Sequence, residues 1–181
     1  MHDLLQYKIR NDLKIGDDPE SINSIFVEID KNSIGTKRNV IIGCIYRPPW
    51  VKLSTFNGLL EKMFESIQSE NKYLYILGDF NVDLTPQAET TLATEEFKNI
   101  FSSYHLYPLI NKPTRETKTS NTIIDNIYCN IPYPLDTCDV GILRPFIADH
   151  NAIFCIMNNV SLRREKLTYT KVENACLAIK I

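Results

Sequence analysis

The chain has 181 residues, of which 44% are hydrophobic and 23% are charged. This is the composition of an ordinary globular domain, so we expect one folded domain and exclude a disordered chain. The formal net charge of -2 argues against general, non-specific binding to nucleic acid, because neutralising phosphates requires clustered lysine and arginine.

The cysteines and the apolar runs indicate the environment of the protein. Five cysteines form an odd set without a CxxC pair, mostly inside apolar runs, where a free cysteine behaves as a small hydrophobic residue. They are Cys44, Cys129, Cys138, Cys155 and Cys176. We therefore expect a reducing, intracellular location and no zinc site. No cationic and apolar leader opens the chain, and runs such as "VIIGCIY" are too short to span a bilayer, so we predict a soluble protein without a membrane partner.

Two β-branched apolar runs predict neighbouring buried strands in the N-terminal part. They are "SIFVEI" (24–29) and "NVIIGCIY" (39–46), and a polar stretch containing Gly35 separates them. We expect these strands to pair antiparallel, because so short a polar connection cannot make a parallel crossover. "RPPW" ends the second strand, since proline lacks the ladder donor and restricts the residue before it.

Apolar residues at spacings of three and four then predict an amphipathic helix over about 54–69, which covers one face of the sheet. Ser54 or Thr55 is available as its N-cap. "KYLYILGDF" (72–80) follows as a strand. Phe97, Ile100 and Tyr104 mark a second helix.

The C-terminal half continues with a polar loop, "NKPTRETKTSN", and three more predicted strands. These strands are "TIIDNIYCN" (122–130), "DTCDVGIL" (136–143) and "NAIFCIMN" (151–158). Strands and helices are mixed along the whole chain, which favours an α/β (α+β) layered sandwich. The pattern weakens near residue 160, so we expect a domain over 1–160 and a C-terminal tail over 161–181.

Three of the predicted strands end in, or carry, an acid beside another polar group. The pairs are Asp79 with Asn81, Asp125 with Asn126, and Asp149 with His150. Strand ends meet at one edge of a layered sheet, so acids distant in sequence can converge there. Converging carboxylates raise one another's pKa unless a cation lies among them, and Mg²⁺ suits carboxylate and amide oxygens. With a histidine near neutral pH, the set fits metal-assisted attack of water on a phosphodiester.

Each of these residues also has a plainer interpretation. An Asp-Asn pair after a strand is usually a turn, because both side chains cap their own backbone. "ADH" before a strand is more often a cap and a hydrogen-bonded histidine than a catalytic pair. Tyr46, taken alone, is an aromatic strand residue.

Five motifs in order carry a resemblance to a known family: "GCIYRPP", "YILGDFNVDL", "LINKPTR", "TIIDNIY" and "ADH". Over roughly residues 1–160 the chain resembles the endonuclease/exonuclease/phosphatase superfamily, specifically the endonuclease domain of animal non-LTR (LINE-type) retrotransposons. The resemblance implies a four-layered α/β sandwich that requires Mg²⁺ (or Mn²⁺). It also implies nicking of DNA ahead of target-primed reverse transcription in the nucleus. The partner in the intact element would be a reverse-transcriptase domain, which is absent here.

By match to the family motifs, the resemblance implies four catalytic roles. Asp79 would bind the metal or activate the attacking water, and Asn81 would hold that water or the phosphate. Asp125 would orient His150, and His150 would contact the scissile phosphate.

Three further residues receive roles in the same way. Asp149 would contribute to the metal region, and Tyr46 would reach a phosphate oxygen. Arg47 would contact the substrate backbone.

The N-terminal segment departs from the family pattern. Family members open with a strand carrying a metal-site Asn and a second strand carrying the principal metal-binding Glu, whereas "MHDLLQYKIRNDLKI" resembles the segment after both. Asn11, Glu20 and Glu28 have no matching context, and Ala148 replaces the usual Ser. We therefore expect a fold that lacks its first strands, with an exposed apolar surface and a weakened metal site. The alternative function is an inactive retroelement remnant that acts at most as a protein- or nucleic-acid-binding module.

Overall fold

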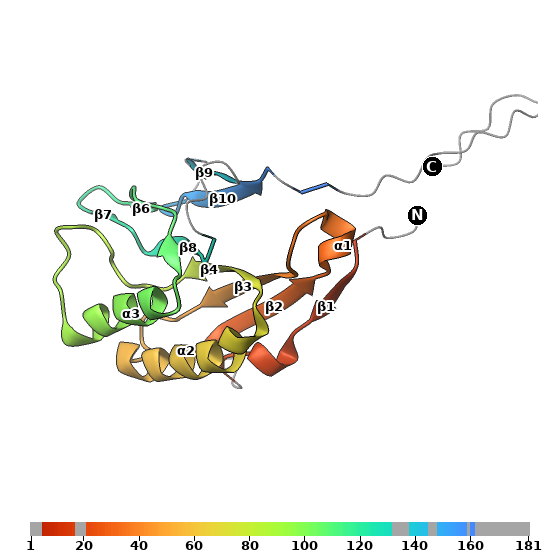
Figure 1. The fold of residues 1–181 in the computed structure, drawn as a ribbon. Helices are drawn as coiled ribbons and strands as arrows, with labels where there is room; N and C mark the ends of the chain where they lie inside the picture. The colour runs from red at the N-terminus through yellow and green to blue at the C-terminus, as the bar shows by residue number, and fades with distance from the viewer. Residues whose placement is uncertain (1–4, 17–20, 132–137, 145–147, 159, 162–181) are drawn as a thin grey trace, which may run out of the picture.

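The protein is described here by a computed structural model that covers residues 5–16, 21–131, 138–144, 148–158 and 160–161. Two helices form one layer, a six-stranded sheet forms the next, and a two-stranded sheet lies on its other side (Figure 1). The predicted layered α/β class is confirmed. The predicted C-terminal tail lies outside the described residues except for Ser161. No described helix is long and apolar enough to cross a membrane.

The central sheet is mixed and has the strand order β1-β2-β3-β4-β8-β5. Its strands are β1 (Tyr7–Ile9), β2 (Asn23–Ile29), β3 (Val40–Tyr46), β4 (Tyr73–Asp79), β8 (Asp125–Cys129) and β5 (Tyr107–Pro108). β2 and β3 pair antiparallel, with Ser24 opposite Ile45, as the sequence predicts. Their connection also contains the short helix α1 (Lys31–Ile34), which was not predicted from the sequence. β3 and β4 are parallel, and all other neighbours in this sheet are antiparallel.

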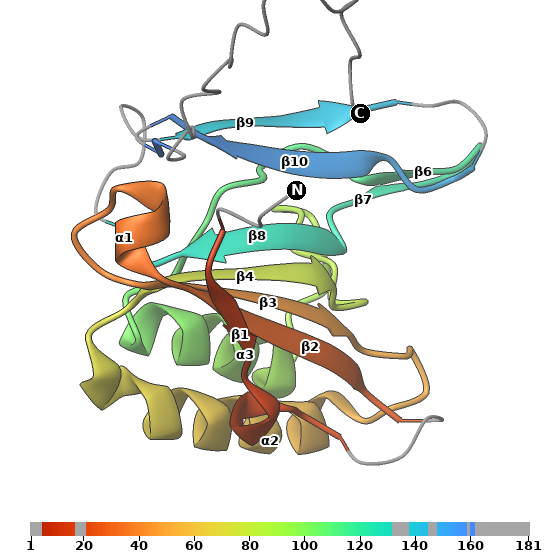
Figure 2. The ribbon, with the colours of Figure 1, turned by 90° about the vertical axis from the view of Figure 1, so that its right-hand side faces the viewer.

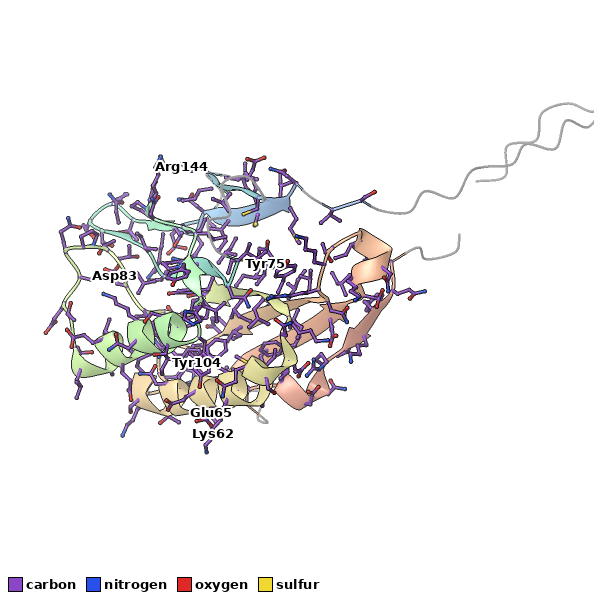
Figure 3. All side chains as sticks on the ribbon, in the orientation of Figure 1. Lys62, Glu65, Tyr75, Asp83, Tyr104 and Arg144 are labelled. Atoms are coloured by element: carbon purple, nitrogen blue, oxygen red, sulfur yellow. The ribbon has the colours of Figure 1, made fainter. Side chains whose placement is uncertain are left out.

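Helices α2 (Leu53–Ile67) and α3 (Leu92–Ser103) cover one face of this sheet (Figure 2). α2 makes the crossover between the parallel strands β3 and β4, and Lys62 and Glu65 lie on its solvent side (Figure 3). The predicted N-cap of α2 is wrong: the cap is Lys52, which makes no side-chain cap hydrogen bond. Single-turn 3₁₀ helices η1 (Asn11–Leu13) and η2 (Gln68–Glu70) lie near the same face.

Buried aromatic side chains fill the space between the helices and the sheet. Phe101 stacks on Tyr128 with ring centroids 3.8 Å apart, and Phe80 lies edge-on to both rings. The face-to-face and edge-on contacts of such rings add to the hydrophobic effect of their burial. This core lies directly beneath the chain segment that follows β4 and so fixes its position.

A second core lies between the central sheet and the small sheet of β9 (Cys138–Leu143) and β10 (Ala152–Met157). Tyr75 points into this space from β4 (Figure 3). Residues 111–121 were predicted to form a polar loop. The structure instead shows a short hairpin that begins in this segment, with β6 (Arg115–Glu116) paired to β7 (Asn121–Thr122). Strands of two residues leave too little periodicity to be seen in a sequence.

Beyond the small sheet, the outer face of β1 to β3 exposes large apolar side chains. Tyr7, Ile9 and Ile25 are 61%, 56% and 55% exposed. They alternate along their strands with residues such as Phe26 that face the helices. An exposed apolar surface was expected in this N-terminal part, and its origin in absent strands stays a prediction.

Candidate active site

Two acids meet where β4 ends and β8 begins. Asp79 and Asp125 are register partners in the antiparallel pair, so their side chains leave the sheet on the same face. Tyr46, the last residue of β3, is the register partner of Asp79 on its other side. These three side chains therefore form one row across three strands, on the face opposite the helices.

The chain around Asp79 is shaped by a close approach of two strands. Gly78 has φ 151°, and a Cβ at this position would lie 1.8 Å from the Ile45 carbonyl oxygen. Only glycine fits there. After it, Asp79 Oδ1 accepts a hydrogen bond from the backbone NH of Asn81 at 3.0 Å, and Asn81 is left-handed with φ 49°. The plainer interpretation, a turn capped by Asp79, is therefore also correct.

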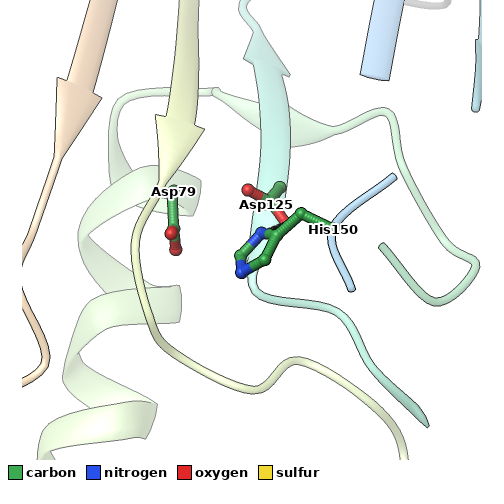
Figure 4. A group of neighbouring side chains, drawn as sticks. All are labelled: Asp79, Asp125 and His150. Atoms are coloured by element: carbon green, nitrogen blue, oxygen red, sulfur yellow. Dashed lines mark hydrogen bonds and ion pairs between the residues drawn. The ribbon is translucent and has the colours of Figure 1, made fainter. Parts of the chain in front are cut away.

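His150 joins the row from a distant part of the chain. Its Nδ1 lies 3.2 Å from Asp125 Oδ2, and Figure 4 shows the second ring nitrogen turned to the side of Asp79. Thr114, fully buried, positions both partners: its Oγ1 accepts from the Asp125 NH at 3.1 Å, and its carbonyl accepts from the Asn151 NH at 2.6 Å. Thr114 was not predicted as a site residue, although it lies inside the motif "LINKPTR".

Asp79, Asp125 and His150 could together hold a metal ion. One ligand atom from each lies within 4.8 Å of the others, and within the described residues no further group of three or more such side chains is found. Burial first, and then the charge of Asp125, raise the pKa of Asp79. A cation would relieve this cost, because it stabilises the ionised form of a half-buried carboxyl. The carboxylate oxygens of Asp79 and Asp125 suit Mg²⁺ or Mn²⁺.

Comparisons with known proteins add to this geometry. The sequence itself matches no family model and no curated protein. Among solved structures, it is similar to the endonuclease domain of TRAS1, a telomere-specific non-LTR retrotransposon, with a TM-score of 0.64 and 16% identity over 87% of this chain and 70% of that chain. An endonuclease/exonuclease/phosphatase family protein from Leptotrichia buccalis gives a TM-score of 0.50 and 12% identity over 88% of this chain and 61% of that chain.

The chain has the endonuclease/exonuclease/phosphatase fold. Two further structures with this fold are similar to it over most of its length. An AP endonuclease from Archaeoglobus fulgidus gives a TM-score of 0.56 and 14% identity over 80% of this chain and 69% of that chain. The 3′ phosphatase NExo from Neisseria, bound to a product DNA hairpin, gives a TM-score of 0.56 and 13% identity over 85% and 70%.

Within this endonuclease/exonuclease/phosphatase fold, Asp149 is adjacent to the cluster in sequence but its carboxylate is not part of it. Arg115 Nε donates to Asp149 Oδ2 at 2.7 Å, and this hydrogen bond is the main reason that the pKa of Asp149 is lowered. The structure therefore places Asp149 in an exposed ion pair and does not bring it to Asp79 and Asp125. Its predicted contribution to the metal region has no direct support in this arrangement.

Arg47 has a different position from the one expected of a substrate contact. It is only 5% exposed, and its guanidinium donates to the carbonyl oxygens of Phe80 at 2.6 Å and Asn81 at 2.7 Å. Asn81 Nδ2 in turn donates to the Arg47 carbonyl at 2.9 Å. Because its guanidinium donates to backbone carbonyls, Arg47 stabilises the loop after Asp79. The structure therefore gives Arg47 a structural role in place of the predicted contact with the substrate backbone. Asn81, which was also predicted to contact the substrate, lies beside Asp79.

Proposed function

We propose that the Asp79–Asp125–His150 cluster is the active site of a divalent-metal-dependent phosphodiester hydrolase that nicks DNA. The observation that carries this is the contact of 3.2 Å between His150 Nδ1 and Asp125 Oδ2, with Asp79 one strand away. The similarity of fold to an AP endonuclease and to the TRAS1 endonuclease domain supports it. We further propose that nicking serves retroelement integration, in line with the sequence motifs.

In this proposal Asp125 is the positioning residue and His150 contacts the substrate. A carboxylate on Nδ1 fixes the orientation of the imidazole and leaves Nε2 to act on the substrate. In the imidazolium form both ring nitrogens carry a proton, and Nε2 would donate to a non-bridging phosphate oxygen, where negative charge develops during attack by water. Fixed donors aimed at such charge lower the barrier, because they require no reorganisation during the reaction.

Asp79 and Tyr46 complete the row. The Asp79 carboxylate would hold the attacking water and accept its proton. The Tyr46 hydroxyl, on a side chain that is 39% exposed, would donate to a phosphate oxygen. A bound Mg²⁺ or Mn²⁺, held mainly by Asp79, would supply Lewis-acid stabilisation of the phosphoryl charge.

Plasmid nicking tests this function. We expect the purified chain to convert supercoiled plasmid to open circles in Mg²⁺ or Mn²⁺ and to stop in excess EDTA. In a second arm, family-like upstream strands carrying an Asn and a Glu are added to the chain. We expect faster nicking by this longer protein, by about 10²-fold or more, because further oxygen ligands hold the ion in better geometry.

One observation favours the alternative of a non-catalytic module: Asp125 uses one carboxylate oxygen on His150, so Asp79 is left as the main acidic ligand. Under this alternative neither protein nicks plasmid in any metal, while DNA binding remains. Nicking that persists unchanged in EDTA would contradict the metal-dependent proposal directly.

A further inference from the structure

One large aromatic side chain near the site lies on the surface and takes little part in the core. Trp50 is 70% exposed, and it is the single tryptophan of the chain. An indole loses most of its potential hydrophobic stabilisation when it stays in water. Most of the Trp50 side chain is therefore accessible to a ligand.

The turn that carries Trp50 is rigid. The Val51 NH donates to the Pro48 carbonyl at 3.1 Å, which closes a four-residue turn with Pro49 second and Trp50 third. Proline at the second position presets the backbone of such a turn. The indole is therefore presented from a fixed backbone, and ordering it on a ligand costs little further entropy.

The same turn is attached to the site through Arg47. The Arg47 guanidinium donates to the Val51 carbonyl in the turn and to the Asn81 carbonyl in the loop after Asp79. The backbone NH of Arg47 donates to the Asp79 carbonyl at 3.0 Å. The Trp50 turn and the Asp79 loop therefore form one hydrogen-bonded unit at the same edge of the sheet.

We propose that Trp50 is a stacking platform for an unpaired nucleobase next to the phosphodiester held at the cluster. This inference rests on the proposed function and narrows its substrate to nucleic acid with an exposed base. Aromatic side chains stack on any base through its π-face and so bind without sequence preference. Stacking suits this chain, because a formal net charge of -2 offers little general attraction for phosphates.

The single tryptophan makes the contact directly measurable. Intrinsic fluorescence is followed while a short oligothymidylate is added, with Ca²⁺ in place of Mg²⁺ and the strand checked by gel to be intact. We expect saturable quenching by oligothymidylate and little by an abasic strand of the same length. Equal quenching by both strands would overturn the proposal, because only one of them carries bases.

Variants test the energetic role with a labelled oligonucleotide and fluorescence anisotropy. Trp50→Ala is expected to weaken binding at least about fivefold, and Trp50→Phe to restore most of the loss. The matched control is Tyr107→Ala, which removes a side chain that is 52% exposed at the far end of β8. Unchanged affinity of Trp50→Ala, or an equal loss in Tyr107→Ala, would also overturn the proposal.

Hydrolysis of a small phosphodiester without a base, such as bis-p-nitrophenyl phosphate, separates this inference from the proposed function. We expect Trp50→Ala to hydrolyse it like the unchanged protein and His150→Ala to lose that activity. Hydrolysis without any Trp50 effect on oligonucleotide binding would reject stacking and leave the function standing. Trp50-dependent binding without hydrolysis in any protein would reject the function and leave the stacking site standing.

Discussion

His150→Ala is expected to lower the rate of metal-dependent plasmid nicking by about 10³-fold. The substitution removes the imidazole that would contact the scissile phosphate, while the two acids stay in register across β4 and β8. Asp125→Asn should cost less, about 10- to 100-fold, because Asp125 acts through the orientation of His150 at 3.2 Å. Rates are measured by densitometry of open-circle product, with circular dichroism confirming that each variant folds.

The matched control for this prediction is His105→Asn. His105 is exposed and has φ 57°, a conformation that asparagine adopts readily. It lies beyond the C-terminal end of α3, in a different part of the chain from the cluster. Nicking should stay within about twofold of the unchanged protein, since nothing at the cluster is altered. If His150→Ala nicked as fast as His105→Asn, the assignment of the site would be lost.

The largest expected loss of stability comes from Glu28, at the other end of the central sheet. Glu28 is 2% exposed, and its carboxylate accepts from Arg10 Nη1 and Lys72 Nζ, each at 2.7 Å. Glu28→Gln removes the buried anion of this network, although Arg10 keeps its ion pairs with Asp12 and Glu70. We expect the free energy of unfolding to fall by about 3 kcal/mol. Urea unfolding measures this. Glu95→Gln, an exposed acid on α3, should change it by less than about 0.5 kcal/mol.

The pH dependence gives a second measure of the same carboxylate. Burial acts to raise the pKa of Glu28, but hydrogen bonds from Lys72, Asn39 and Arg10 outweigh it and lower the pKa from 4.5 to about 2. A lowered pKa means that the stabilisation is fully present above the ordinary value and is lost as the pH falls towards 2. The stability gap between the unchanged protein and Glu28→Gln should therefore narrow below about pH 4.5. A gap that is constant down to pH 2 would contradict the ion-pair network.

Long periodic elements of this fold are predictable from sequence, and short ones are not. Helices α2 and α3 and strands β2, β3 and β4 show clear apolar patterns, because each buries one or both of its faces. α1 and the β6–β7 hairpin have two to four residues per element, so local hydrogen bonds rather than periodicity define them. The N-cap of α2 was wrong because Ser54 and Thr55 lie inside a helix that begins at Leu53.

The same distinction applies to the site: its residues can be recognised in local motifs, but contacts between distant segments cannot. Asp79, Asp125 and His150 could be named from motifs and were expected at one edge of the sheet. Which of them lie in contact depends on strand register, which no local pattern encodes. The hydrogen bonds of the Arg47 guanidinium were not predictable, because their acceptors are the main-chain carbonyls of Phe80 and Asn81, more than thirty residues away. Asp149 was assigned to the metal region by match to the family motifs, and its hydrogen bond from Arg115 could not be predicted from the sequence.

Binding of Mn²⁺ to Asp79→Asn tests most directly whether this edge of the sheet is a divalent-metal site. Asparagine keeps a side-chain oxygen for the Asn81 NH, so the turn is preserved while the charge is removed. Free Mn²⁺ is followed by electron paramagnetic resonance during titration of the unchanged protein, Asp79→Asn and the control Glu95→Gln. We expect one ion per chain, an affinity at least about tenfold weaker in Asp79→Asn, and no change in Glu95→Gln. Equal Mn²⁺ affinity in all three proteins would contradict a metal site at Asp79.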